Sequence, residues 1–199
     1  MPLPRAQASL RFEAGQAAAL SMLARWNAQA LPLNASCWFE QEGRPLLTLR
    51  LRGAEAAVRS ACAALGGEAL APDIAERFWA DCRDQCLVFF RAGDDTDLAL
   101  WRLSIAPTSP ALALPQAQLI EWHGGLRWLW APTSESVAIR AAAAQAGGHA
   151  SMFRAPSDAA KAQGVFHPLS PATLSIQQEL KRQFDPAGIF NPGRLYPGL

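Results

Sequence analysis

The sequence predicts an α+β fold in which duplicated ferredoxin-like units form one antiparallel sheet with helices mainly on one face. The first observation behind this prediction is an order of hairpin, helix, Gly-Gly pair and short strand that occurs twice along the chain. The second is composition, because 50% of the 199 residues are hydrophobic and only 18% are charged, which is typical of a chain that buries a sizeable core. Chance recurrence of Gly-Gly helix ends is the alternative, but the hairpins before them match as well.

The first unit is expected to span about residues 8–70. Its central hairpin alternates, with three leucines on one side and polar residues on the other, which predicts a sheet exposed on one face. The alternating residues are Leu47, Leu49 and Leu51 against Thr48, Arg50 and Arg52. The expected elements are a strand at 9–13, a helix at 15–30, a hairpin of 34–40 and 45–52 turned at 42–44, a helix at 53–65 that ends at Gly66-Gly67, and a strand at 68–70.

A connecting segment is expected over about 72–90, with a helix at 73–84 whose inner stripe is Ile74, Phe78 and Cys82, followed by a short apolar run. The polar loop at 93–97 holds three carboxylates. It lacks the ligand spacing of a calcium-binding EF-hand loop, so a solvated turn is the favoured interpretation.

The second unit is expected over about 97–154. Gly124-Gly125 predicts a tight hairpin turn, and the tryptophans of that hairpin, Trp122, Trp128 and Trp130, are expected to pack in the sheet. The expected elements are a strand at 98–105, a hairpin of 118–123 and 126–130, a helix capped by Thr133 or Ser134 that ends at Gly147-Gly148, and a strand at 149–154.

Charge and cysteine usage restrict the class of protein. A net charge of +1 with scattered basic residues gives no electrostatic surface for nucleic acid. No early apolar segment predicts a signal peptide, and the longest uncharged run, 106–120, holds three prolines and is too short to span a bilayer, so we expect a soluble chain without a transmembrane segment. Cys82 and Cys86 could share a helix face and bind a metal or form a disulfide, but buried, reduced cysteines are favoured, which fits a cytoplasmic protein.

The last part of the chain, 170–199, predicts a helix followed by an ordered tail. Ser170 can cap the helix, with Pro171 as its first residue. Three apolar side chains recur at every fourth position on one face of this helix: Ile176, Leu180 and Phe184. The tail that follows contains three prolines, which restrict it, so we expect it to lie on a surface.

The residues at 184–194, Phe-Asp-Pro-Ala-Gly-Ile-Phe-Asn-Pro-Gly-Arg, resemble the carboxy-terminal signature of FAD-linked oxidases of the vanillyl-alcohol-oxidase type. Within that family, the accessory FAD-binding-type subunits of bacterial glycolate oxidases are the nearest resemblance. The resemblance implies that residues 1–199 are a single cap domain, placed behind an FAD-binding domain. No glycine-rich loop between a strand and a helix is present to hold a pyrophosphate, so this sequence does not contain that FAD-binding domain.

The resemblance also implies a function and partners. We expect a cap that shapes a flavin pocket or a subunit interface in an FAD-dependent 2-hydroxy-acid (glycolate) oxidase, inactive and without bound FAD as an isolated chain. The partners would be the missing FAD-binding domain and other glycolate oxidase subunits, among them an iron–sulfur subunit. Such a protein would be cytoplasmic, or associated with a membrane through its partners. The alternative is a stand-alone ferredoxin-like module that binds a protein or small ligand without a redox role.

The cofactor-binding candidates, Asn191 and Arg194, follow from the resemblance, since in such oxidases this tail returns to the flavin. The alternative is a tail that packs on its own sheet. Catalytic residues are unknown, and the substrate-facing candidates are His123, Arg127, His149 and Arg154. The family's metal motif, H-x-G-D-G-N-x-H, would fall at 122–129, where one histidine remains and the Asp, the Asn and the second His are missing. One histidine does not hold a divalent metal alone, so we expect no metal site.

Overall fold

The computed structural model describes residues 4–91, 97–196 and 199. The first half contains β1 (Ala6–Glu13), α1 (Gln16–Asn27), β2 (Leu33–Gln41), β3 (Arg44–Gly53), α2 (Glu55–Leu65) and β4 (Glu68–Ala69). The connecting segment contains α3 (Pro72–Arg83) and α4 (Val88–Arg91). The second half contains β5 (Ala99–Ser104), β6 (Gln118–Glu121), η1 (Trp122–Gly124), β7 (Leu126–Ala131), η2 (Thr133–Glu135), α5 (Ser136–Gln145) and β8 (His149–Arg154), and the chain continues with α6 (Asp158–Ala162) and α7 (Pro171–Phe184).

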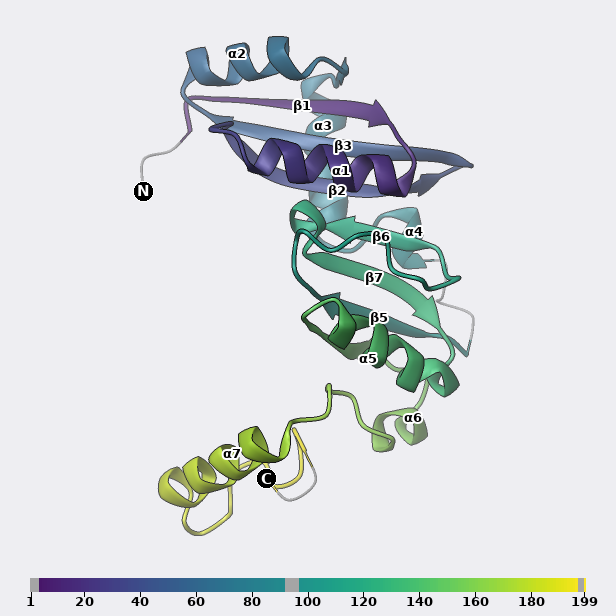
Figure 1. The fold of residues 1–199 in the computed structure, drawn as a ribbon, viewed down its shortest axis with the longest axis vertical. Helices are drawn as coiled ribbons and strands as arrows, with labels where there is room; N and C mark the ends of the chain where they lie inside the picture. The colour runs from purple at the N-terminus through teal and green to yellow at the C-terminus, as the bar shows by residue number, and fades with distance from the viewer. Residues whose placement is uncertain (1–3, 92–96, 197–198) are drawn as a thin grey trace.

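The strands form one antiparallel sheet in the order β4-β1-β3-β2-β6-β7-β5-β8, which confirms the predicted fold class (Figure 1). The two halves meet where β2 pairs with β6, through Cys37 opposite Glu121 and Trp38 opposite Ile120. Each half places its strands in a corresponding order, with β5 in the position of β1 and β8 in the position of β4. In the described residues, α1 has no counterpart, because 105–117 connects β5 to β6 as a loop.

Helices cover both faces of the sheet. In Figure 1, α1 and α5 lie in front of the strands, while α3 and α4 lie behind them. One core cluster packs under α1 and α2, a second under α5, and a third on the opposite face under α3 and α4. Leu47, Leu49 and Leu51 are buried on one face, as expected, but Thr48 on the other face is also buried. The predicted half-exposed sheet is therefore wrong at Thr48, because α3 covers this side.

Three local predictions are corrected. Ile74 is 51% exposed, and α3 instead buries Phe78, Trp79 and Cys82. Neither Thr133 nor Ser134 caps α5, because both lie in the short η2 helix that precedes it. The predicted loop at 93–97 lies outside the described residues except for Asp97.

The second hairpin also differs from the prediction. Strand β6 ends at Glu121, and four residues rather than a Gly-Gly turn lead to β7. Trp122 and His123 adopt positive φ angles of 49° and 55°, and Trp122 is 61% exposed instead of packed in the sheet. Left-handed backbone at two large residues is uncommon.

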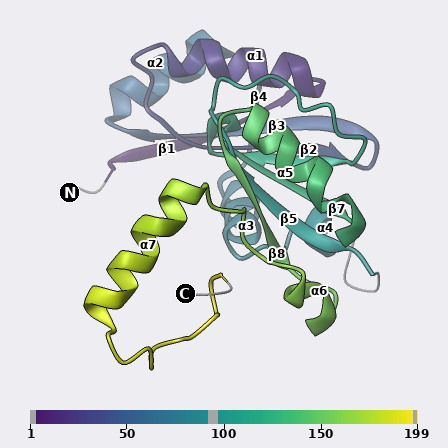
Figure 2. The same ribbon diagram turned by 60° about the horizontal axis from the view of Figure 1, so that its bottom comes forward.

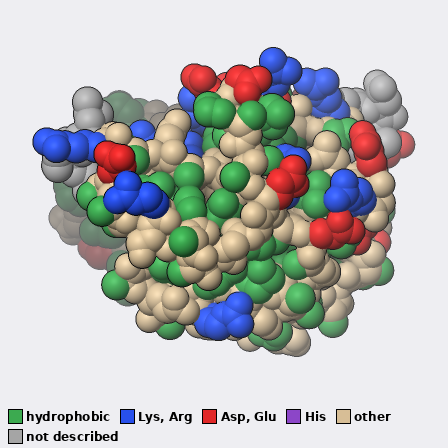
Figure 3. Space-filling view, turned by 90° about the horizontal axis from the view of Figure 1, so that it is seen from above, with side chains coloured by type: hydrophobic (Ala, Val, Ile, Leu, Met, Phe, Trp, Pro, Cys, Tyr) green, Lys and Arg blue, Asp and Glu red, His purple; other side chains and the backbone are tan. Residues whose placement is uncertain are grey.

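The charged side chains follow the even composition. On the end of the molecule that carries α2 and β1, basic and acidic side chains are interspersed rather than gathered by sign (Figure 3). Among the described residues, no helix has the length and the apolar stretch needed to cross a membrane.

Candidate functional site

Helix α7 begins and ends where the sequence predicts. The Ser170 side chain accepts a hydrogen bond from the Thr173 amide, and Pro171 is the first helical residue. No residue of α7 is buried, and the helix with its tail stands away from the sheet (Figures 1 and 2). This region is therefore ordered locally without packing on the sheet as a core helix does.

The apolar side chains of this region face solvent. The stripe that the helical spacing predicts is exposed along its whole length, and Phe184 at its end is 83% exposed. Three further apolar side chains of the tail are also more than half exposed. The full set is Ile176, Leu180, Phe184, Ile189, Phe190 and Leu195, here called the apolar tail surface. An ordered segment with this many exposed large apolar groups is typical of an interaction surface.

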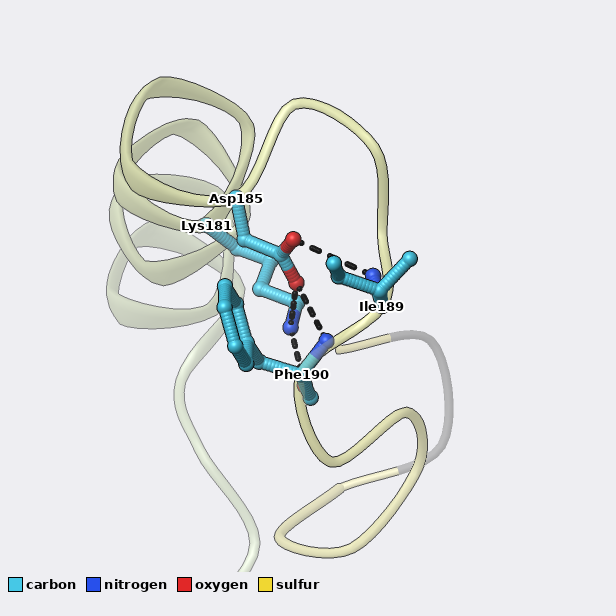
Figure 4. Close-up of polar contacts among 4 residues, drawn as sticks. All are labelled: Lys181, Asp185, Ile189 and Phe190. Atoms are coloured by element: carbon cyan, nitrogen blue, oxygen red, sulfur yellow. Dashed lines mark hydrogen bonds and ion pairs between the residues drawn. The ribbon is translucent and has the colours of Figure 1, made fainter.

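The loop after α7 is held by one carboxylate (Figure 4). The Asp185 side chain is nearly buried and accepts hydrogen bonds from the amides of Ile189, at 3.1 Å, and Phe190, at 2.9 Å. The Lys181 ammonium group, one helical turn earlier, donates to the same carboxylate at 2.5 Å and also to the Phe190 carbonyl. We call this arrangement the Lys181–Asp185 clasp. It closes the loop on the helix end and fixes the backbone that carries Ile189 and Phe190.

The clasp also changes the acidity of its carboxyl group. The hydrogen bond from Lys181 holds the pKa of Asp185 below its ordinary value, and the Phe190 and Ile189 amides act in the same direction, while burial opposes them. Asp185 therefore stays ionised, and able to accept these bonds, over a wider pH range than an ordinary aspartate.

The cofactor-binding candidates follow the clasp directly. Asn191 is exposed and has a left-handed backbone with φ of 48°, and its carbonyl accepts a hydrogen bond from the Arg194 amide. Arg194 is exposed and lines a shallow cavity of about 300 Å³ together with Phe153 of β8. The Tyr196 hydroxyl donates to the His167 carbonyl at 3.0 Å, which ties the end of the tail to the segment before α7.

Two of the four substrate-facing candidates have structural contacts. Arg127 is fully buried, and its guanidinium donates to the carbonyls of Gly124, Ser109 and Pro110. Burial lowers the pKa of Arg127 to about 10. Arg154 donates to the Phe90 carbonyl and to the Gln85 side chain, and so joins β8 to the segment around α4.

The two histidines lie apart from these arginines in the contacts of the structure. His123 sits in the strained connection after β6, where its amide donates to the Ser36 hydroxyl and its Nδ1 atom is buried without a partner. Burial lowers the pKa of His123. His149 is exposed and its ring lies 6.5 Å from that of His167. No contact joins any two of the four candidates among the described residues.

The cysteines and acids were also tested as metal ligands. Among residues 4–91, 97–196 and 199, no group of three or more His, Cys, Asp or Glu side chains is arranged to hold a metal ion. The Cys82 thiol donates to Glu121, at 3.1 Å, and the Trp128 indole donates to the other oxygen of the same carboxylate, at 2.7 Å. The four cysteines have free thiols, and Cys86 is exposed.

Sequence reasoning missed the Lys181–Asp185 clasp, although a signal was present. A lysine one turn before a helix end and an aspartate just after it are placed to pair. An aspartate followed by proline and glycine also commonly accepts bonds from the backbone of a turn.

Comparison with known proteins agrees with the tail motif. Residues 159–195 match the family described as FAD linked oxidases, C-terminal domain. The chain corresponds to the C-terminal domain of FAD-linked oxidases. It is also 41% identical, over all 199 residues, to glycolate oxidase subunit GlcE of Escherichia coli (strain K12). The chain spans 51% of that relative, so about half of the relative has no counterpart here. The resemblance predicted from residues 184–194 is thereby confirmed.

Proposed function

We propose that this chain is the cap half of an FAD-linked subunit that serves a 2-hydroxy-acid oxidase of the glycolate oxidase kind. The observation that carries the proposal is the apolar tail surface, which is prefolded by the Lys181–Asp185 clasp yet exposed. The occupant of this surface would be an FAD-binding half that corresponds to the part of GlcE outside the match.

The energetics of docking favour this occupant. Covering a large apolar side chain contributes about 1.5–3 kcal/mol when its burial is complete, so six such side chains offer a substantial driving force. Binding normally costs free energy because loops must become ordered. The clasp has already ordered the loop of Ile189 and Phe190, which lowers that cost.

The chain's own residues fit one edge of a flavin but not a whole FAD. When bound, FAD would accept the two electrons removed from a 2-hydroxy acid. The Asn191 amide can both donate to and accept from the polar edge of an isoalloxazine ring, and Arg194 can bond an oxygen there. Both side chains are exposed on a constrained backbone. The pyrophosphate would need the other half, and the isolated chain is proposed to be inactive.

The remaining candidates have different standing. We retain His123 and His149 as substrate-facing candidates, because each leaves ring atoms without a strong protein partner. Arg127 and Arg154 are not retained, since their guanidinium groups are engaged by carbonyl and amide oxygens. Further glycolate oxidase subunits, including an iron–sulfur subunit, are proposed as partners, in the cytoplasm or at a membrane that those partners bind.

The proposal is tested on the full-length subunit that contains both halves. Purified wild-type protein is expected to be yellow, and Asn191→Ala should lower flavin affinity about tenfold, as expected for one lost hydrogen bond to a polar ring edge. Phe190→Ser should weaken flavin retention by loosening the docked tail. Asn27→Ala, at the exposed end of α1, is the matched control.

Two results would contradict the proposal. A colourless full-length protein that stays monomeric with every glycolate oxidase subunit would favour the stand-alone module. Flavin affinity and spectrum unchanged in Asn191→Ala would remove Asn191 from the cofactor contacts while leaving the docking role to be judged from Phe190→Ser.

A further inference from the structure

A cavity of about 630 Å³ opens between α3 and the strands β1 and β3, apart from the tail elements. Its wall contains three arginines, Arg50, Arg52 and Arg83, and one acid, Glu76. The lining therefore carries an excess of two positive charges. A cavity walled by cations attracts anions more strongly than an open surface with the same charges does.

Two of these arginines lack an acidic partner. Arg83 is bound by Asp84, at 2.8 Å, and stays at the exposed rim. Arg50 and Arg52, two residues apart on β3, project from the same face of the strand, and within the described part of the chain no carboxylate forms an ion pair with either. Their charges are thus left for a ligand.

Arg50 is the more deeply placed of the two. Its Nε atom is buried without a hydrogen-bond partner, which costs free energy unless an acceptor arrives. Its guanidinium carbon lies 4.9 Å from the centre of the Trp79 ring, and the Trp79 indole is fixed in turn by a 2.9 Å bond to the Ser9 hydroxyl. Burial, and then the neighbouring Arg52, lowers the pKa of Arg50.

A second cavity, of about 380 Å³, shares Arg50, Trp79 and Arg83 with the first. Its acid, Glu121, is already bound by the Cys82 thiol and the Trp128 indole. Arg50 therefore stands between two cavities without a carboxylate of its own. Rigid support behind a cation and open volume in front of it are the features of a built anion site.

We propose that the cavity between β1, β3 and α3 binds a small oxyanion, a carboxylate or a phosphate, with Arg50 and Arg52 as its ligands and Trp79 as the residue that positions Arg50. The site is a binding site only and involves no bond making. It is separate from the docking tail, so it stands or falls independently of the function proposed above.

The test is calorimetric titration of the full-length protein with two probes, inorganic phosphate and oxalate. At least one anion is expected to bind saturably at one site per chain, and the preference between them tells a phosphoryl ligand from a carboxylate ligand. Arg50→Met and Arg52→Met should each weaken that binding about tenfold or more, because each removes charge-assisted hydrogen bonds. Arg59→Met is the matched control, since Arg59 is exposed on α2 and only loosely paired with Glu55.

The design separates local from global effects. Arg52 is exposed, so Arg52→Met reports on the anion even if Arg50→Met unfolds the protein. No saturable binding of either probe would overturn the proposal. Equal affinities in wild type and both variants, or an equal loss in Arg59→Met, would overturn it as well.

Discussion

The two halves of the sheet solve one packing problem in different ways. In the first half, α1 covers the strands with Leu20, Leu23 and Trp26, which are all buried. In the second half a loop occupies the corresponding connection, and the buried Arg127 holds it through carbonyls of Ser109 and Pro110. A loop has unpaired carbonyls that a helix would satisfy internally. The comparison teaches that a duplicated unit can lose a helix if a buried multivalent donor replaces its hydrogen bonds.

The largest expected effects come from removing each solution. Leu23→Ala leaves a cavity under α1 and should lower the free energy of unfolding by about 3–4 kcal/mol. Arg127→Met leaves the loop carbonyls without donors and should cost about 2–3 kcal/mol. Urea unfolding followed by tryptophan fluorescence measures both.

The loop can be examined directly in the same variants. Arg127→Met should increase amide exchange within 105–117 beyond the increase seen in Leu23→Ala. Equal exchange of that loop in both variants would mean that Arg127 does not hold it, and the comparison between the halves would fail.

The two central hairpins allow a smaller, sharper comparison. Gly43, in the β2–β3 turn, has φ of 77° and no atom within 4 Å of an added Cβ, so Gly43→Ala should cost about 1 kcal/mol of backbone strain. Gly124, before β7, has φ of 99°, and an added Cβ would lie 2.8 Å from the Pro107 carbonyl oxygen. Gly124→Ala should therefore cost about 2–3 kcal/mol. Thermal unfolding of the two single variants tests the ranking, which equal midpoints would contradict.

The smallest effect on global stability is expected at the clasp. The pKa of Asp185 is lower in the folded protein than in the unfolded chain, so its contribution is present above the unfolded pKa and is lost as pH falls through the folded pKa. Acid should therefore release the Ile189 and Phe190 amides, measured by hydrogen exchange, while the sheet amides stay protected. Asp185→Asn should show the released state at neutral pH, and Arg182→Met serves as the control. Amides that stay protected in Asp185→Asn would show that the loop does not depend on the clasp.

What the sequence predicted depends on how local the signals are. The bounds of α7 follow from Ser170, Pro171 and the Asp185-Pro186 stop, which act within a few residues, and they agree with the structure. The burial of Thr48 could not be predicted in this way, because it depends on α3 crossing the opposite face. The exposed Ile74 and the strained Trp122 also reflect tertiary packing that no local period encodes.

The candidate site shows the same division. The motif at 184–194 predicted the family, because its prolines, glycines and asparagine occupy fixed places. The roles of Arg127 and Arg154 were beyond sequence reasoning, since their partners at Ser109 and Phe90 lie far along the chain. The proposed roles of Asn191 and Arg194 stay predictions.

The seam between the halves has a consequence for how this protein could be divided. Only two residue pairs join β2 to β6, yet Ile120 of the second half belongs to the core cluster under α1. The cluster under α3 and α4 likewise combines Cys37 and Phe39 with Leu100 and Leu119. Cutting the chain after α4 would expose apolar surface on both pieces, so neither repeat should survive as an independent folding unit. The ancestral repeat, if it once stood alone, has been merged into one cooperative body.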